Sequence, residues 1–297
     1  MSKKPQIPVL PQFKQKLTHE QKIRLNRLID EFSKLGETLN IQYFYHDSLV
    51  NNTPLHNPKN YPLVDYIKQF NLSPDDLPIF AVMVSSDKLH FANDDRYFVP
   101  LHSVCAIADL QVAGSETLII NELYRCHTYD NDYLSELAPF CLAKFGREAF
   151  DNFVNASNQL DDPFAKSIFQ ETFKIIAQTQ PKNREPAIDV LVKSLQDFAN
   201  HDKTYNSFLI SSLVDLKANE YSPFIKQAFD ADCVDLSVQG DYEEVEILFG
   251  IRQQRSTPRP EFWGNDDEWQ ALRALFQTEQ ELPEPILLNQ AIQQLTK

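Results

Sequence analysis

The chain has 297 residues, 42% of them hydrophobic, and a formal net charge of −14 at pH 7. This length and apolar content suffice for a large buried core. The negative charge argues against a nucleic-acid partner, because phosphate contacts require clustered Lys and Arg, and only 6 glycines disfavour folds built on phosphate-binding loops.

The N-terminus differs from the rest of the chain in charge. Residues 1–30 have seven Lys and Arg against Glu20 and Asp30, so the net charge of −14 leaves −19 for the remainder. Residues 1–17 contain three prolines and several lysines without a sustained apolar period. We therefore expect residues 1–17 to form a flexible basic arm that is either mobile or loosely docked.

An N-terminal helical region is predicted over residues 18–98. Its first helix begins after Thr18, an N-cap residue with Gln21 three positions later, and ends near Gly36. Residues 37–60 are rich in Asn and Pro, and their pattern leaves open a short strand or part of a helix. Further helices are expected from about residue 62 and from Ser73.

Residues 99–250 have a regular rhythm of paired amphipathic segments. The predicted pairs are 100–110 with 116–125, 133–145 with 149–157, 164–178 with 186–199, and 207–216 with 223–229. Leu110, Phe145 and Leu216 fall at equivalent places, 35 and 71 residues apart, and we expect all three to be buried. A period near 35 with two helices per unit is typical of an α-solenoid. The alternative is a non-repetitive bundle whose helices share a length.

The segments VPLHSVCAIADLQVAGSETLIINEL and ISSLVDLKANEYSPFIKQAFDAD resemble HEAT-like repeats. Residues 99–250 as a whole resemble a group of uncharacterised bacterial HEAT-repeat proteins, in which the last repeat runs into a phrase like FDADCVDLSVQGDYEEVEILFGI. The resemblance implies an all-α, HEAT-like α-solenoid of stacked antiparallel helix pairs, which is a curved scaffold for binding other molecules. The lyases that attach bilin pigments to antenna proteins also contain HEAT-like repeats. The resemblance supplies no catalytic residues.

The C-terminal residues 251–297 begin with a turn-rich link, RQQRSTPRPEFWGNDDE. Two helices are predicted after it, DEWQALRALFQ and PILLNQAIQQLT. Their apolar side chains, including Trp269 and Leu272, give them enough surface to dock as a cap on the last repeat.

The catalytic and metal-binding motifs that are recognisable from sequence do not occur. The chain has no GxGxxG, GxxxxGK[ST], HExxH or GxSxG motif, which favours a non-catalytic protein without a cofactor. The densest local cluster is RCHTYDNDY, with Cys126, His127, Asp130 and Asp132. It can be interpreted as a metal site, but we favour a polar loop in which Asp132 caps the next helix, and we expect no metal.

Cysteine usage and hydropathy bear on the cellular setting. The four Cys lie in apolar stretches without CxxC spacing, which predicts buried, reduced thiols. The N-terminus has no apolar signal core, and the longest apolar run, LPIFAVMV at 77–84, is too short to cross a bilayer. We expect a cytoplasmic protein that does not contact a membrane.

The predicted function is a non-catalytic scaffold or adaptor that binds a protein partner through the concave face of the solenoid. Two alternatives remain: an enzyme or chaperone that holds a small molecule in the groove, such as a pigment lyase, and an acidic mimic of nucleic acid. The candidate binding residues on the second helices are Asn121, Glu122, Arg125, Asn152, Asn155, Asp189, Lys193, Lys226 and Gln227.

An acidic segment near the end of the repeats is a further candidate. Residues 227–251 contain seven carboxylates and no Lys or Arg. We expect the segment to form a continuous negative surface that engages a basic partner, for which the N-terminal arm is one candidate. The alternative is a solvated acidic face. The residues assigned to this surface are Asp241, Glu243, Glu244 and Glu246.

Overall fold

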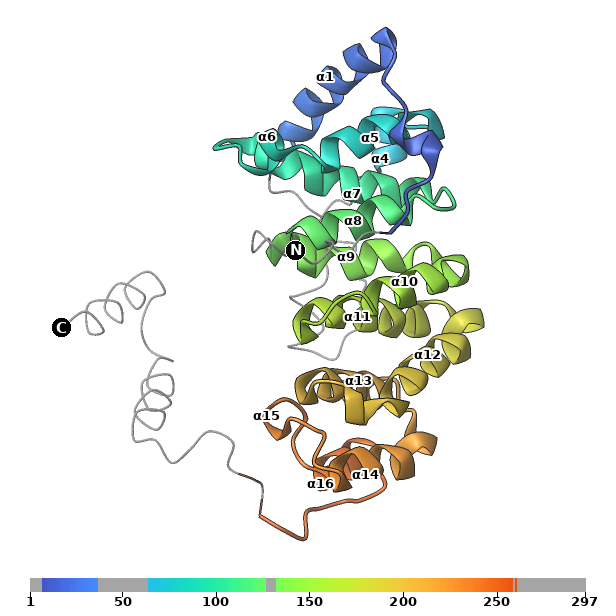
Figure 1. Ribbon diagram of the computed structural model, residues 1–297, viewed down its shortest axis with the longest axis vertical. Helices are drawn as coiled ribbons and strands as arrows, with labels where there is room; N and C mark the ends of the chain where they lie inside the picture. The colour runs from blue at the N-terminus through green and yellow to red at the C-terminus, as the bar shows by residue number, and fades with distance from the viewer. Residues whose placement is uncertain (1–6, 37–63, 127–131, 259, 261–297) are drawn as a thin grey trace, which may run out of the picture. The chain divides into compact units, whose positions relative to one another are not determined.

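The fold was obtained as a computed structural model, which describes residues 7–36, 64–126, 132–258 and 260 (Figure 1). Over these residues the protein is all-helical and has no strand. None of the described helices is both long enough and apolar enough to cross a membrane. The chain divides into two compact units, Met1–Val234 and Asp235–Lys297, which are described separately below.

Unit 1 begins with the 3-10 turn η1 (Pro11–Lys14) and ends after helix α14. Its α-helices are α1 (His19–Ser33), α4 (Tyr66–Phe70), α5 (Leu77–Val84), α6 (Asp87–His90), α7 (Val99–Leu110), α8 (Glu116–Cys126), α9 (Asp132–Ala143), α10 (Phe150–Ser157), α11 (Pro163–Thr179), α12 (Arg184–Gln196), α13 (Lys203–Asp215) and α14 (Ser222–Asp230). Short 3-10 turns precede α5, α7, α10, α12, α13 and α14.

The first helix, α1, begins as the sequence predicts. The Thr18 side chain accepts a hydrogen bond from the Gln21 amide, and the Gln21 side chain accepts one from the Thr18 amide, which completes a capping box. Arg24 joins α1 to the next elements, because its guanidinium bonds the Asp76 carboxylate at 3.0 Å and the carbonyl oxygen of Phe70 at 2.9 Å. These bonds attach α1 to α4 and to the start of α5.

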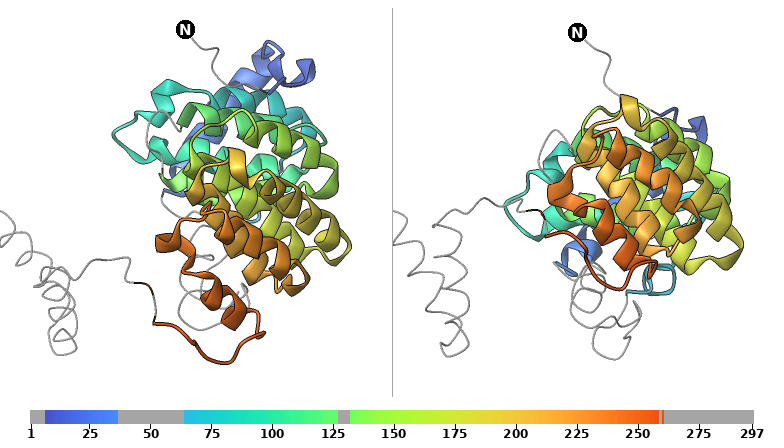
Figure 2. Two further views of the ribbon diagram at one scale, coloured as in Figure 1. Left: turned by 60° about the horizontal axis from the view of Figure 1, so that its bottom comes forward. Right: turned by 90° about the horizontal axis from the view of Figure 1, so that it is seen from below.

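Four helix pairs follow, at the positions that the sequence predicts: α7 with α8, α9 with α10, α11 with α12, and α13 with α14. The first helices contact one another in succession, α7 with α9, α9 with α11, and α11 with α13 (Figure 2). The second helices of the first three pairs contact the first helix of the next pair: α8 with α9, α10 with α11, and α12 with α13. Consecutive pairs are therefore also neighbours in space.

The core between these helices is built from apolar side chains at a fixed place in each second helix. The fourth residues of α8, α10, α12 and α14 all have 0% of their side-chain surface exposed: Ile119, Phe153, Ala187 and Ile225. Phe153 also contacts the ring of Phe173 on α11, with centroids 6.0 Å apart. Burial of this kind stabilises a fold by about 1.5 to 3 kcal/mol for each large side chain.

The three residues expected at equivalent buried sites do not behave alike. Leu216 is 5% exposed and Phe145 is 9% exposed, so both are buried. Leu110 is only half-buried, so the prediction of full burial is wrong for this residue. The reason is that the three sites are not equivalent: Leu110 is the last residue of α7, whereas Phe145 and Leu216 lie beyond the last residues of α9 and α13.

A buried histidine joins three segments of unit 1. The Nε2 of His102 donates to the Gly36 carbonyl oxygen at 2.9 Å, so its Nδ1 accepts from the Tyr66 hydroxyl at 2.7 Å. The ring is 0% exposed, and burial lowers the pKa of His102 to about 4. The neutral ring satisfies both partners, whereas a protonated ring would place a charge in an apolar site.

We predict that His102 makes unit 1 less stable at acid pH. The folded pKa of about 4 lies below the unfolded value of about 6.5, so the loss begins as pH falls below 6.5 and is complete near pH 4. Between pH 7.5 and pH 5 this group should cost about 2 kcal/mol of unfolding free energy in urea titrations. His102→Gln keeps one acceptor and one donor but does not titrate. Its unfolding free energy should therefore fall by about 2 kcal/mol less than that of the unaltered chain between pH 7.5 and pH 5. An equal fall in the variant and the unaltered chain would contradict the assignment.

Two of the four cysteines lie in the core as free thiols. Cys105 on α7 and Cys141 on α9 are both buried. A hydrogen bond with the Cys105 thiol, together with burial, holds the pKa of the Cys141 thiol well above its usual range. Cys233 is only half-buried, which corrects the expectation that it lies inside.

Unit 2 is described from residue 235 to residue 258 and at 260. It contains α15 (Leu236–Gln239) and α16 (Tyr242–Leu248). Asp235 caps α15 and Asp241 caps α16, each through a side-chain oxygen that accepts a backbone N–H. The two helices predicted at the C-terminus, and residues 37–60, lie outside the described residues.

Candidate functional site

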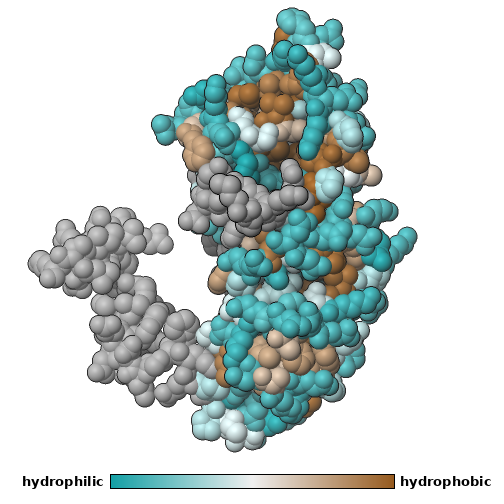
Figure 3. All heavy atoms as spheres, in the orientation of Figure 1, coloured by the Kyte–Doolittle hydropathy of each residue, from teal (hydrophilic) through white to brown (hydrophobic). Residues whose placement is uncertain are grey.

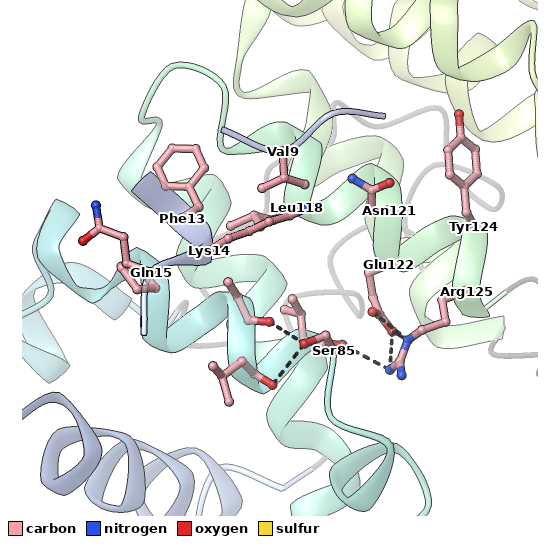
Figure 4. Close-up of a pocket in the computed structure, with 14 residues that line it drawn as sticks. Val9, Phe13, Lys14, Gln15, Ser85, Leu118, Asn121, Glu122, Tyr124 and Arg125 are labelled. Carbon is pink, nitrogen blue, oxygen red and sulfur yellow. Dashed lines mark hydrogen bonds and ion pairs between the residues drawn. The ribbon is translucent and has the colours of Figure 1, made fainter. Parts of the chain in front are cut away.

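A pocket of about 580 Å³ lies in unit 1 between the N-terminal segment, α5 and α8. Its lining is mostly apolar, and its polar groups come from α8, from the end of α5 and from Lys14 and Gln15 of the N-terminal segment (Figure 4). One of the hydrophobic areas on the surface in Figure 3 lies in the upper part of the view, between α1 and α7. The lining residues are Val9, Phe13, Lys14, Gln15, Pro78, Ala81, Val82, Val84, Ser85, Leu118, Asn121, Glu122, Tyr124 and Arg125.

The N-terminal segment, defined here as residues 7–16, forms one wall of this pocket. Ile7 is 4% exposed and Phe13 is 3% exposed, so both side chains are buried against the helices. The turn η1, which contains Phe13, contacts α5. This part of the chain is therefore docked rather than mobile, which were the two forms expected for the arm of residues 1–17. Residues 1–6 lie outside the described part.

Asn121 on α8 holds the backbone of the N-terminal segment. Its Oδ1 accepts from the Ile7 amide at 3.0 Å, and its Nδ2 donates to the Ile7 carbonyl oxygen at 2.8 Å. The Nδ2 also donates to the Thr117 carbonyl oxygen at 2.7 Å, one turn earlier in α8, which fixes the orientation of the amide. The hydrogen bonds from Asn121 to Ile7 are thus made to the main chain, and they do not depend on the identity of the side chain.

The link between α7 and α8 is shaped to receive the same segment. Gly114 has a φ of +84°, a conformation that favours glycine. A Cβ at this position would lie 2.5 Å from Leu10 Cδ1, so the Leu10 side chain occupies the space that any other residue would fill. Leu10 lies between the buried residues Ile7 and Phe13 in the sequence, and its own side chain remains 40% exposed.

Glu122 lies at the base of the pocket in a buried ionic network. Its carboxylate is 2.8 Å from His90 Nε2 and 3.1 Å from the Arg125 guanidinium, and its side chain is 3% exposed. Arg125 also pairs with Asp87 and donates to the Val84 carbonyl oxygen. Glu122 was predicted to belong to the binding surface of the second helices, and the structure buries its side chain, because α8 turns the residue toward α6.

The hydroxyl groups in the pocket wall are used by the fold. Ser85 Oγ donates to the Ala81 carbonyl oxygen at 2.7 Å, within α5. Tyr124 donates to the Ala156 carbonyl oxygen at 2.9 Å, and partial burial raises the pKa of Tyr124. Among the residues that the structure describes, neither hydroxyl is paired with an imidazole or carboxylate that would activate it as a nucleophile.

The other candidate residues of the second helices are spread along α10, α12 and α14. Asn155, Asp189, Lys193, Lys226 and Gln227 are exposed, and Lys226 bonds the Asp230 carboxylate at 2.7 Å. Asn152 is half-buried and donates to the buried Glu116 carboxylate at 2.7 Å, so it packs α10 against α8. The structure does not bring these residues together at the pocket, where Asn121, Glu122 and Arg125 meet.

One regularity in this set was missed by the sequence reasoning. Asn121, Asn155, Asp189 and Gln227 are each the sixth residue of their helix, in α8, α10, α12 and α14 respectively. The last three are exposed, and Asn121 is half-covered by the N-terminal segment. We call these four residues the sixth-position row. Helix bounds, which the sequence sets only to within a few residues, were needed to see it.

The acidic residues of unit 2 are paired within their own chain. Arg252 bonds Glu243 at 3.0 Å and Glu246 at 2.8 Å. Arg255 pairs with Asp241 and lies 3.3 Å from Glu244. The expected negative surface is therefore engaged by a basic group, but the group is two arginines of the next few residues rather than the N-terminal arm.

The bonds in this cluster favour the ionised carboxylates. A hydrogen bond from Ser256, supported by Thr257, lowers the pKa of Glu243 to about 2. The Arg255 guanidinium holds the pKa of Asp241 below its usual range. The cluster thus ties residues 252–257 to the start of α16.

No metal site is formed by the residues that the structure describes, because no group of three or more His, Cys, Asp or Glu side chains is close enough to share an ion. Asp132 is the first residue of α9, while His127 and Asp130 of the same candidate cluster lie outside the described residues.

Comparison of the chain with protein-family models, with curated proteins and with solved structures finds no match in any of the three.

Proposed function

We propose that unit 1 is a HEAT-like α-solenoid that serves as a non-catalytic scaffold and binds a protein partner along its second helices. The proposal is supported by four consecutive helix pairs whose first helices contact one another in order. Stacking of this kind leaves the second helices to form one continuous face, which is the usual binding surface of such proteins.

The observation that carries the proposal is the sixth-position row. Side chains at equivalent places on successive repeats can contact successive parts of one extended partner. Three of the four are exposed amide or carboxylate groups, and such groups bond peptide backbones without a requirement for a particular side chain. The fourth, Asn121, makes this contact with the chain's own Ile7.

A small-molecule function is the second candidate, and the volume of the pocket favours it. A volume of about 580 Å³ lies within the range of ligand sites, about 300 to 1,000 Å³. Its buried ionic residues, however, are already bonded to one another, which leaves Lys14 and Gln15 at the rim as polar groups for a ligand. The nucleic-acid mimic, which the net charge of −19 outside residues 1–30 suggested, stays a third candidate, and Arg252 and Arg255 neutralise part of that charge in unit 2.

The test uses photo-crosslinking residues placed singly at Asn155 and Asp189, with Glu136 as control. Glu136 is exposed as well, but it lies on α9, a first helix. In cells, the first two positions should crosslink to one and the same protein, and Glu136 should not. The purified partner should then bind Asn155→Arg and Asp189→Arg chains at least about tenfold more weakly and bind Glu136→Arg unchanged. Equal binding by all three variants would refute the proposal.

A further inference from the structure

We propose that the groove between α5 and α8 is a binding site for a peptide of a partner protein that starts extended and continues into a 3-10 turn, and that the N-terminal segment occupies the groove in cis. The inference rests on the proposed function and names its partner class. The peptide has an apolar residue, an aliphatic residue three positions later and an aromatic residue three positions after that. Ile7, Leu10 and Phe13 show this spacing.

The first argument is the form of the contact at Asn121. A single side-chain amide accepts from the N–H and donates to the C=O of the same residue, Ile7. This pairing requires an extended backbone whose two polar groups point the same way, as in recognition by strand addition. Because the third bond of the amide, to Thr117, holds it in place, the site is formed before any segment binds.

The second argument is that the segment is stiff. Leu10 has φ −57° and ψ 138°, and Gln15 has φ −67° and ψ 145°, so the backbone is extended on both sides of the 3-10 turn η1. Pro8 and Pro11 restrict the chain further. A stiff segment loses little entropy on binding, and this is why Pro-rich peptides are common ligands of apolar grooves.

The third argument is that the groove is larger than its present occupant. About 580 Å³ remains beside Phe13, against Ala81 and Val82 of α5. Val82 is 41% exposed in this wall. A partner with a larger side chain beside its aromatic residue would bury more apolar surface than the N-terminal segment does, which gives it the advantage needed to displace that segment.

Displacement requires no unfolding of the helices. Among the described residues, the segment is held by the two Asn121 bonds, by the side chains of Ile7 and Phe13, and by the fit of Leu10 against Gly114. It precedes α1, whose N-terminus has its own capping box at Thr18. Release of residues 7–16 therefore leaves α1 capped and the helix pairs intact.

The test uses the full chain and a fluorescent peptide of residues 5–16, PQIPVLPQFKQK. Ile7→Asp with Phe13→Asp should release the segment in cis, and fluorescence anisotropy should then show peptide binding at least about tenfold tighter than to the unaltered chain, whose own segment competes at high effective concentration. Adding Asn121→Ala should weaken this binding at least about tenfold. Glu136→Ala in the same background is the control, because Glu136 is exposed on α9 and away from the groove, and it should leave binding unchanged. Ile7→Asp alone provides a milder second variant, in case the double variant loses its cooperative melting transition.

A displayed library of random 12-residue peptides then tests the partner class. Selection on the Ile7→Asp, Phe13→Asp chain should enrich the apolar, aliphatic and aromatic spacing described above, and Asn121→Ala should abolish the enrichment. Absence of enrichment, or peptide binding that ignores Asn121, would overturn the inference. A dimer of the unaltered chain that disappears in the double variant would also overturn it, by assigning the groove to a second copy. These results are independent of the crosslinks at Asn155 and Asp189, so failure here is distinguishable from failure of the scaffold proposal.

Discussion

Phe153→Ala should lower the free energy of unfolding by about 3 to 5 kcal/mol, the usual cost of emptying a large core site. The Phe153 side chain is 0% exposed, and its ring meets that of Phe173 edge-on at 73°. It joins α10 to α11, so its removal opens a cavity between two successive helix pairs. Urea denaturation followed by circular dichroism measures the change directly.

The matched control is Phe164→Ala on α11. Phe164 also contacts a ring, that of Phe208 at 5.5 Å, but its side chain is 64% exposed. The same substitution should therefore cost less than about 1 kcal/mol. Similar losses for the two variants would show that the interface between the second and third helix pairs is not packed as described.

Glu122→Gln should destabilise unit 1 by about 3 kcal/mol, because it removes one partner from a buried charge network. The side chain keeps its size, but Arg125 and His90 lose the carboxylate that lies 3.1 Å and 2.8 Å from them. Arg125 keeps its pair with Asp87, which places the expected loss at the low end of the range for buried pairs. Thermal melting of the full chain at pH 7.5 measures it.

Glu185→Gln is the control for Glu122→Gln. Glu185 pairs with Arg184 at 2.8 Å, but its side chain is 69% exposed. Exposed pairs contribute about 0 to 1 kcal/mol, so melting should change little. If Glu122→Gln changed the melting as little as this surface variant does, Glu122 would not hold Arg125 in place. The pocket wall that these residues form would then be more mobile than the structure indicates.

The helix pairs could be predicted because their signal is local. Apolar residues at helical spacing mark each helix, and the residues at the fourth position of the second helices, such as Ile119 and Ile225, are buried as an amphipathic pattern requires. The capping box at Thr18 was likewise readable, because its two partners are three residues apart. Patterns between residues only a few positions apart therefore suffice to predict the all-helical fold class and the order of the helices.

Side-chain direction at single positions could not be predicted with the same certainty. One position along a helix turns a side chain by about 100°, which is enough to move Glu122 from the expected surface into the network with His90. The helix ends likewise place Leu110 inside α7 but Phe145 and Leu216 beyond α9 and α13, so the three sites differ. Both results depend on where a helix starts or stops, which sequence patterns define only within a few residues.

The pocket depends on contacts between residues far apart in the sequence, and the acidic cluster depends on residues outside the segment predicted from the sequence. The pocket combines residues 9–15, 78–85 and 118–125, and nothing in any one of these segments indicates the other two. The acidic segment was defined as residues 227–251, and this range ends one residue before Arg252. Arg252 is the first of the two arginines that pair with the carboxylates of the segment. The spacing of Ile7, Leu10 and Phe13 was present in the sequence, but the prolines around it favoured the interpretation as a flexible arm.

The most direct test of a single groove with two competing occupants is hydrogen exchange at the Ile7 amide, measured by NMR on the full chain. In the free protein this amide should exchange slowly, because it donates to Asn121 Oδ1. Saturation with a library-selected peptide should speed its exchange to the rate of an unstructured chain, while buried amides such as that of Phe153 stay protected. If the peptide binds and the Ile7 amide remains as protected as before, the two do not share a site and the account is contradicted.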